Sequence, residues 1–77
     1  MNQHLENKLK IGKNKKYALI IGANPSQGAR SPKLWNKVYK SQDSKTRMYP
    51  ADVKEKKVKH LIQYLKEDPL FIGGSVT

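Results

Sequence analysis

The sequence predicts an α/β fold: a three-layer βαβαβ unit whose parallel sheet has the strand order 2-1-3 and carries helices on both faces. Strand-like segments at 17–23, 46–53 and 70–77 alternate with helix-like segments at 32–42 and 54–67. The first strand segment is apolar without a break, which is typical of a strand buried on both faces in the middle of a parallel sheet. Because parallel crossovers are right-handed, the two helices should cover opposite faces of that strand.

The first sixteen residues have little apolar content and no firm periodicity. They hold five of the sixteen basic residues: Lys8, Lys10, Lys13, Lys15 and Lys16. We interpret residues 1–16 as a basic N-terminal tail with a short ordered piece at 9–11, and residues 17–77 as the folded domain.

The first strand gives way to a polar loop, residues 24–31, within the stretch IIGANPSQGARSP. Ser31 is a favourable N-cap, and Pro32 suits the first turn of the helix that follows. In this helix apolar and aromatic residues recur four apart on one face: Leu34 with Val38 and Trp35 with Tyr39.

The second strand, 46–53, contains Pro50, which lacks the N–H that a central strand must donate, so the strand should lie at an edge of the sheet.

The second helix, 54–67, has an apolar stripe at the spacing i, i+3, i+4, i+7: Val58, Leu61, Ile62 and Leu65. Asp68 and Pro69 end this helix. The third strand, 70–77, contains a glycine pair.

A sheet with the order 2-1-3 reverses direction at its first strand, and ligands bind such sheets outside the carboxyl ends of the strands at that point. The loop 24–31 and the end of the third strand should meet there. The loop matches no phosphate-binding motif, because five residues separate Gly22 from Gly28 and Ala29 follows. It offers a polar set for another ligand: Asn24, Ser26, Gln27, Arg30 and Ser31.

The composition limits the function classes. The chain has no cysteine, so disulfides and thiolate chemistry are excluded, and neither a membrane span nor a signal peptide is evident in the sequence. We therefore expect a cytoplasmic protein without a membrane partner. The net charge of +10 is compatible with nucleic-acid binding through the basic tail, but only two arginines and no basic-aromatic stripe accompany it, which favours a solvated lysine-rich surface.

No catalytic group stands out. His4 lies in the tail, and His60 lies among helix lysines. We expect no metal site, because no carboxylate pair or cluster of metal ligands is evident.

The order and spacing of three segments nevertheless resemble the amino-terminal domain of shikimate dehydrogenases. Asn24-Pro25 is followed after five residues by Ser31-Pro32, a pattern similar to the N-P-x-x-x-S-x-S-P of that family. A strand with a tyrosine (Tyr49 to Val53), an amphipathic helix and the ending Gly73-Gly74-Ser75-Val76-Thr77, close to G-x-N-V-T, follow in order. The resemblance covers residues 17–77.

The resemblance implies the substrate-binding portion of an NADP-dependent oxidoreductase that interconverts 3-dehydroshikimate and shikimate in aromatic amino acid biosynthesis. It implies substrate contacts from Ser31 and Thr77. Ala29 stands where the family has a further serine, and Ser75 stands where the family has asparagine. These departures leave room for quinate or an amino-hydroxy analogue as the substrate.

The resemblance also implies that the catalytic lysine, the catalytic aspartate and the NADP-binding domain would follow Thr77, so we expect the 77 residues to be an inactive, truncated portion that binds no cofactor. The third strand, as an apolar edge, predicts self-association. Two alternatives are a stand-alone basic module that binds nucleic acid or another polyanion and a structural remnant without a ligand.

Overall fold

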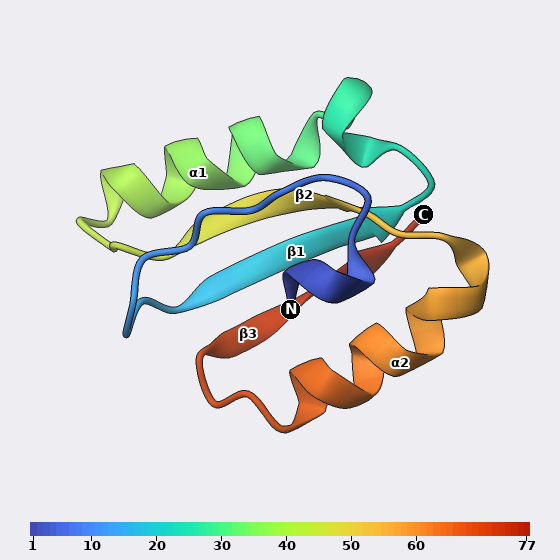
Figure 1. Cartoon of the computed structure of the whole chain (residues 1–77). Helices are drawn as coiled ribbons and strands as arrows, with labels where there is room; N and C mark the ends of the chain where they lie inside the picture. Colours follow the sequence, from blue (N-terminus) through green and yellow to red (C-terminus); the bar gives the residue numbers. More distant parts are fainter.

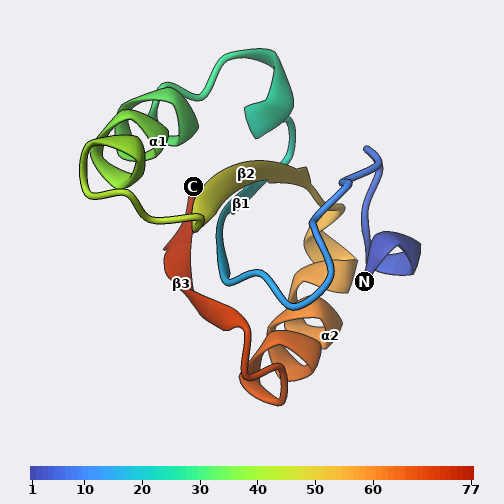
Figure 2. The same ribbon diagram turned by 90° about the vertical axis from the view of Figure 1, so that its left-hand side faces the viewer.

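The computed structural model describes residues 1–77 and confirms the α/β architecture. Three parallel strands, β1 (Tyr17–Gly22), β2 (Arg47–Asp52) and β3 (Phe71–Val76), form a sheet in the order β2-β1-β3. The helices α1 (Ser31–Ser41) and α2 (Glu55–Lys66) lie on opposite sides of the sheet (Figures 1 and 2). Two short 3-10 turns, η1 (Asn2–His4) and η2 (Pro25–Gln27), complete the structure.

β1 is the central strand, and every residue in it is buried. It pairs in register with β2, Tyr17 opposite Arg47 and Gly22 opposite Asp52, and with β3 across a register shift between Tyr17 and Ala18. Gly74 permits the close approach of β3, because a Cβ at this position would collide with the Leu19 carbonyl oxygen. The continuous apolar run thus became a strand that is buried on both faces.

The main core lies on the α2 side of the sheet. It contains alternate residues of β1, the end of β2 and two residues of α2: Tyr17, Leu19, Ile21, Ala51, Val53, Leu61 and Leu65. The ring centroids of Tyr17 and Phe71 are 5.6 Å apart on this face, so the start of β3 also packs there.

The interpretation of residues 1–16 as a tail is wrong for Met1 and Leu5, whereas Leu9 and Ile11 belong to the short ordered piece that was expected at 9–11. Met1, Leu5, Leu9 and Ile11 are partly buried and pack against the core on the α2 side of the sheet. Asn2 closes this segment on itself by two hydrogen bonds with the backbone of Leu9. In Figure 1 the segment runs along β2 on the side of the sheet that α2 occupies. Met1, Leu5 and Leu9 recur four apart, but only residues 2–4 form a helical turn, and the low apolar content of this lysine-rich stretch obscured the spacing in the sequence.

β2 lies at an edge of the sheet, as Pro50 predicts, and two asparagine side chains close that edge. Asn36 accepts a hydrogen bond from the Met48 N–H at 2.6 Å and donates one to the Met48 carbonyl at 3.1 Å. Asn7 donates to the Pro50 carbonyl at 2.9 Å and accepts from the Asp52 N–H at 2.8 Å. Alternate residues of a parallel strand point their backbone groups to the same edge, so these bonds substitute for a neighbouring strand.

α1 packs mainly along β2 and buries none of its residues completely. Leu34, Trp35 and Val38 remain 63%, 49% and 41% exposed, although their spacing predicts a packed face. The expected N-cap is also wrong. Arg30 already has helical backbone angles, so Ser31 is the first residue of the helix and no side chain caps it.

Neither helix is long and apolar enough to cross a lipid bilayer.

Candidate functional site at the carboxyl ends of β1 and β3

Two hollows flank the point where β1 and β3 end. The first, which we call the loop hollow, has a volume of about 380 Å³ and lies against the loop that joins β1 to α1. Its lining is Ile20, Asn24, Pro25, Gln27, Gly28, Ala29, Arg30 and Thr77. The second, the α2 groove, has a volume of about 700 Å³ and lies between these strand ends and α2. Thr77 lines both, so the strand reversal brings together segments that are far apart in the sequence.

Thr77 is held at this junction by the backbone. Its N–H donates to the Ile21 carbonyl at 2.8 Å, which extends the pairing of β3 with β1 by one residue. The hydroxyl lies directly over Gly22, where a Cβ would collide with Oγ1. Glycine at the end of β1 therefore leaves the space that the threonine hydroxyl occupies.

The loop itself is internally hydrogen-bonded. The Gln27 N–H donates to the Asn24 carbonyl at 3.0 Å, and the N–H groups of Gly28 and Ala29 donate to the Pro25 carbonyl at 3.3 and 2.9 Å. The Ser26 N–H donates to Asp52 at 2.9 Å. A phosphate cradle needs free N–H groups that converge on the anion, so these residues fit neither a P-loop nor the pyrophosphate of NADP.

Asp52 is a residue of this site that the sequence reasoning missed. It is 9% exposed, and its carboxylate accepts hydrogen bonds from both the backbone N–H and the hydroxyl of Ser26. Its backbone carbonyl also accepts from the Glu6 N–H at 2.7 Å. Asp52 thus ties the ligand-side loop to the end of β2 and to the N-terminal segment. The only feature of the sequence that could have indicated this role is the single acidic residue at the end of the second strand.

The predicted site residues divide into two groups. Ala29 and Thr77 line the loop hollow together, and Arg30 supplies its only charged side chain. Ser31 starts α1 outside this lining. Ser75 lines a separate hollow of about 320 Å³ beside β3 and α2. The Ser26 hydroxyl, a candidate ligand contact, is committed to Asp52.

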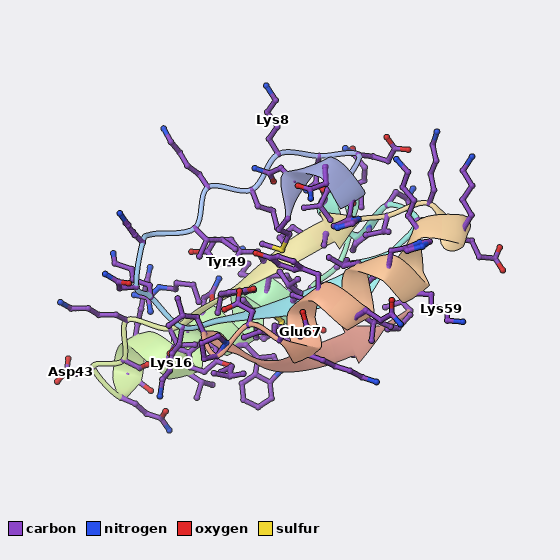
Figure 3. The ribbon with its side chains drawn as sticks, turned by 60° about the horizontal axis from the view of Figure 1, so that its bottom comes forward. Lys8, Lys16, Asp43, Tyr49, Lys59 and Glu67 are labelled. Atoms are coloured by element: carbon purple, nitrogen blue, oxygen red, sulfur yellow. The ribbon has the colours of Figure 1, made fainter.

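The α2 groove is larger and less polar. Val53, Val58, Ile62 and Val76 contribute apolar surface, while Lys59 and Lys66 stand among the polar residues of its lining. Figure 3 shows Lys59 on the outer side of α2. Glu55 also lines the groove, so its two lysines are partly balanced by one carboxylate near Thr77.

The titratable groups outside these hollows form no second catalytic cluster. No three histidine or carboxylate side chains lie close enough together to hold a metal ion. The His4 ring packs 6.1 Å from the Tyr64 ring, and His60 is exposed on α2. Burial raises the pKa of Tyr17 well above its ordinary value, and the hydrogen bond from its hydroxyl to Asp68 raises the pKa further.

A scan against protein-family models found no match for the chain, and neither the curated proteins nor the solved structures searched include a match.

Proposed function

We propose that this chain is the substrate-binding portion of a shikimate dehydrogenase-like oxidoreductase and that the loop hollow takes a small hydroxylated carboxylate. The observation that carries the proposal is the shared lining of the loop hollow by Ala29, Arg30 and Thr77. These residues come from the two segments that a strand order of 2-1-3 brings to the ligand-binding edge of an α/β sheet.

The chemistry of the lining supports a carboxylate. Arg30 is exposed and has the only charged side chain among the eight lining residues, so no side-chain carboxylate opposes an anion there. A guanidinium can donate two parallel hydrogen bonds to a carboxylate. The Thr77 hydroxyl and the amides of Asn24 and Gln27 can donate to or accept from ring hydroxyls. The volume of about 380 Å³ lies within the range of small-molecule sites.

The motif resemblance supports the same class of ligand. In that family the threonine of the last motif contacts the substrate, and Thr77 has the matching position. The proposal depends on Arg30 and Thr77 rather than on Ser31, which lies outside the hollow. Because the N–H groups of residues 26–29 already have partners within the chain, the proposal assigns the loop hollow to the substrate and not to the pyrophosphate of NADP.

The test is calorimetric titration of the 77-residue chain with shikimate and with quinate. We expect Arg30→Gln to weaken binding about tenfold or more, because it removes a charge-assisted hydrogen bond, and Thr77→Ala to weaken it by several-fold. Lys37→Gln, which removes an exposed positive charge on α1, and Thr46→Ala, which precedes β2, are the controls because neither residue lines the loop hollow. Equal losses in the variants and their controls would contradict the proposal.

A further inference from the structure

A second basic hollow lies at the end of the sheet opposite the loop hollow. It has a volume of about 640 Å³ and lies between the N-terminal segment and the start of β2. Lys10, Lys15, Lys45 and Arg47 contribute four positive charges to its lining, and no acidic residue lines it. We call it the basic hollow. The sequence shows these lysines only as parts of separate charged stretches.

Strand geometry brings half of this lining to one face. Lys45, Arg47 and Tyr49 are spaced two apart, and successive side chains of a strand point to opposite faces. Arg47 and Tyr49 pair with Tyr17 and Leu19, whose side chains belong to the core on the α2 side. The N-terminal segment packs on that side, and Figure 3 shows Tyr49 beneath it.

A turn in the N-terminal segment supplies the other half. The Lys15 N–H donates to the Gly12 carbonyl at 3.2 Å, and Asn14 adopts a positive φ of 63° within this turn. The aliphatic stem of Lys15 lies over Gly12, where any Cβ would collide with it. Glycine leaves the space that this stem occupies, and both Gly12 and Lys15 line the basic hollow.

Arg47 is oriented before any ligand arrives. Its Nη1 donates to the carbonyls of Ser44 and Thr46 at 2.7 and 2.6 Å, which fixes the plane of the guanidinium. The Nε and Nη2 donors have no partner within the chain. That free edge has the fork geometry that binds two oxygens of one phosphate group.

No carboxylate neutralises these four charges. The only ion pair of the chain joins Lys54 and Glu6, at 3.3 Å. Asp43 lies with Lys16 at the end of the molecule where β1 begins (Figure 3), but it neither lines the basic hollow nor forms an ion pair. Lys10, Lys15 and Lys45 are exposed, so solvent screens their mutual repulsion, and a chain of phosphates can approach them with several negative charges at close spacing.

We propose that the basic hollow is a binding site for linked phosphate groups, with Arg47 holding one phosphate by its free edge and Lys10, Lys15 and Lys45 neutralising the next ones. Inorganic polyphosphates and the backbone of single-stranded nucleic acid share this chemistry. The site is independent of the loop hollow and of the function proposed for that hollow.

The test uses inorganic tripolyphosphate in calorimetric titration and a fluorescent oligothymidine in anisotropy titration, both with the 77-residue chain. We expect Lys15→Gln/Lys45→Gln to weaken tripolyphosphate binding about tenfold or more. The matched control, Lys56→Gln/Lys57→Gln on α2, removes the same charge far from the hollow and should change binding less than about twofold. Thermal unfolding followed by circular dichroism checks that each variant remains folded.

Two further measurements, on an Arg47→Lys variant and on the salt dependence of oligothymidine binding, test the same site. Arg47→Lys keeps the charge but removes the fork, so we expect it to weaken binding by several-fold. For oligothymidine, the loss of two phosphate contacts should reduce the slope of log K against log salt by about 1.4. Tripolyphosphate binding without oligothymidine binding would assign the site to small polyphosphates. Equal losses in the site and control doubles, or no tripolyphosphate binding at low salt, would overturn the proposal.

Discussion

Asp52, the last residue of β2, accepts two hydrogen bonds from Ser26 in the loop after β1, one from the backbone N–H at 2.9 Å and one from the hydroxyl. The two residues are 26 positions apart in the sequence. Their contact holds the loop that lines the proposed ligand site. The end of β2 therefore helps to position this loop although Asp52 itself does not line the loop hollow.

Removing this contact should destabilise the chain and loosen the loop. We expect Ser26→Ala to lower the free energy of unfolding by about 1.5–3 kcal/mol, because a carboxylate that is almost buried loses a hydrogen bond. Urea unfolding measures the loss, and Ser41→Ala, which removes an exposed hydroxyl bonded within α1, is the matched control. If Ser26→Ala and Ser41→Ala give the same small loss, the contact does not hold the loop.

The closure of the β2 edge by Asn7 gives a second prediction. Asn7→Ala should lower the free energy of unfolding by about 1–3 kcal/mol, because the Asp52 N–H and the Pro50 carbonyl lose their partners. Gln3→Ala, an exposed change in the same segment, should cost less than about 0.5 kcal/mol. An Asn7→Ala variant as stable as Gln3→Ala would mean that residues 1–16 behave as a tail after all.

The Tyr17–Asp68 hydrogen bond, 2.5 Å long, should make stability fall at high pH. Burial and then Asp68 raise the pKa of Tyr17 above the ordinary 10.0, so the unfolded chain loses the phenolic proton first as the pH rises. This contribution to stability is complete below pH 10 and declines above it, by up to about 1.4 kcal/mol per pH unit.

Urea midpoints measured between neutral pH and pH 11 test this coupling. Tyr17→Phe should flatten the decline above pH 10 relative to the wild type. Tyr39→Phe removes a phenol whose hydroxyl has no hydrogen-bond partner in the chain, and serves as the control. Identical alkaline slopes in all three proteins would show that lysine deprotonation alone governs the decline.

Ala29→Ser should strengthen binding of shikimate or quinate. Ala29 is half-buried and lines the loop hollow, and the family that the motifs resemble has a serine at this place. An added hydroxyl that donates to a carboxylate would raise affinity about tenfold. Calorimetric titration measures the change, with Ala23→Ser as the control because Ala23 lines the α2 groove instead. Unchanged affinity for both ligands would place the carboxylate elsewhere.

The 77-residue chain should self-associate through β3. This strand pairs on one side only, and Ile72 and Val76 are 49% and 57% exposed, whereas asparagine side chains close the β2 edge. The charge of +10 on each copy opposes association, so dimers should increase with salt. Sedimentation velocity should show Ile72→Lys to be monomeric and Leu34→Lys, on α1, to behave as the wild type. A monomer at high salt would refute the prediction.

The chain should show no dehydrogenase activity with any nicotinamide cofactor. Its loop N–H groups are committed to internal hydrogen bonds, and no lysine lines the loop hollow to serve as an acid–base group. Reduced-cofactor absorbance during incubation with shikimate measures turnover. Reproducible turnover by the pure chain would contradict the assignment of this chain to substrate binding alone.

The sequence alone determined the strand order and the buried central strand, because an uninterrupted apolar run of strand length leaves few arrangements other than the middle of a parallel sheet. The spacing of Leu61 and Leu65 likewise encoded the packed face of α2 within two turns of helix. The tertiary structure alone decided the rest. Asn7 and Asp52 are 45 positions apart, and Ser26 and Asp52 are 26 apart. A single polar side chain that finds its partner at such a distance leaves no periodic trace in the sequence, so only the folded sheet decided which residues close its edge and hold the loop.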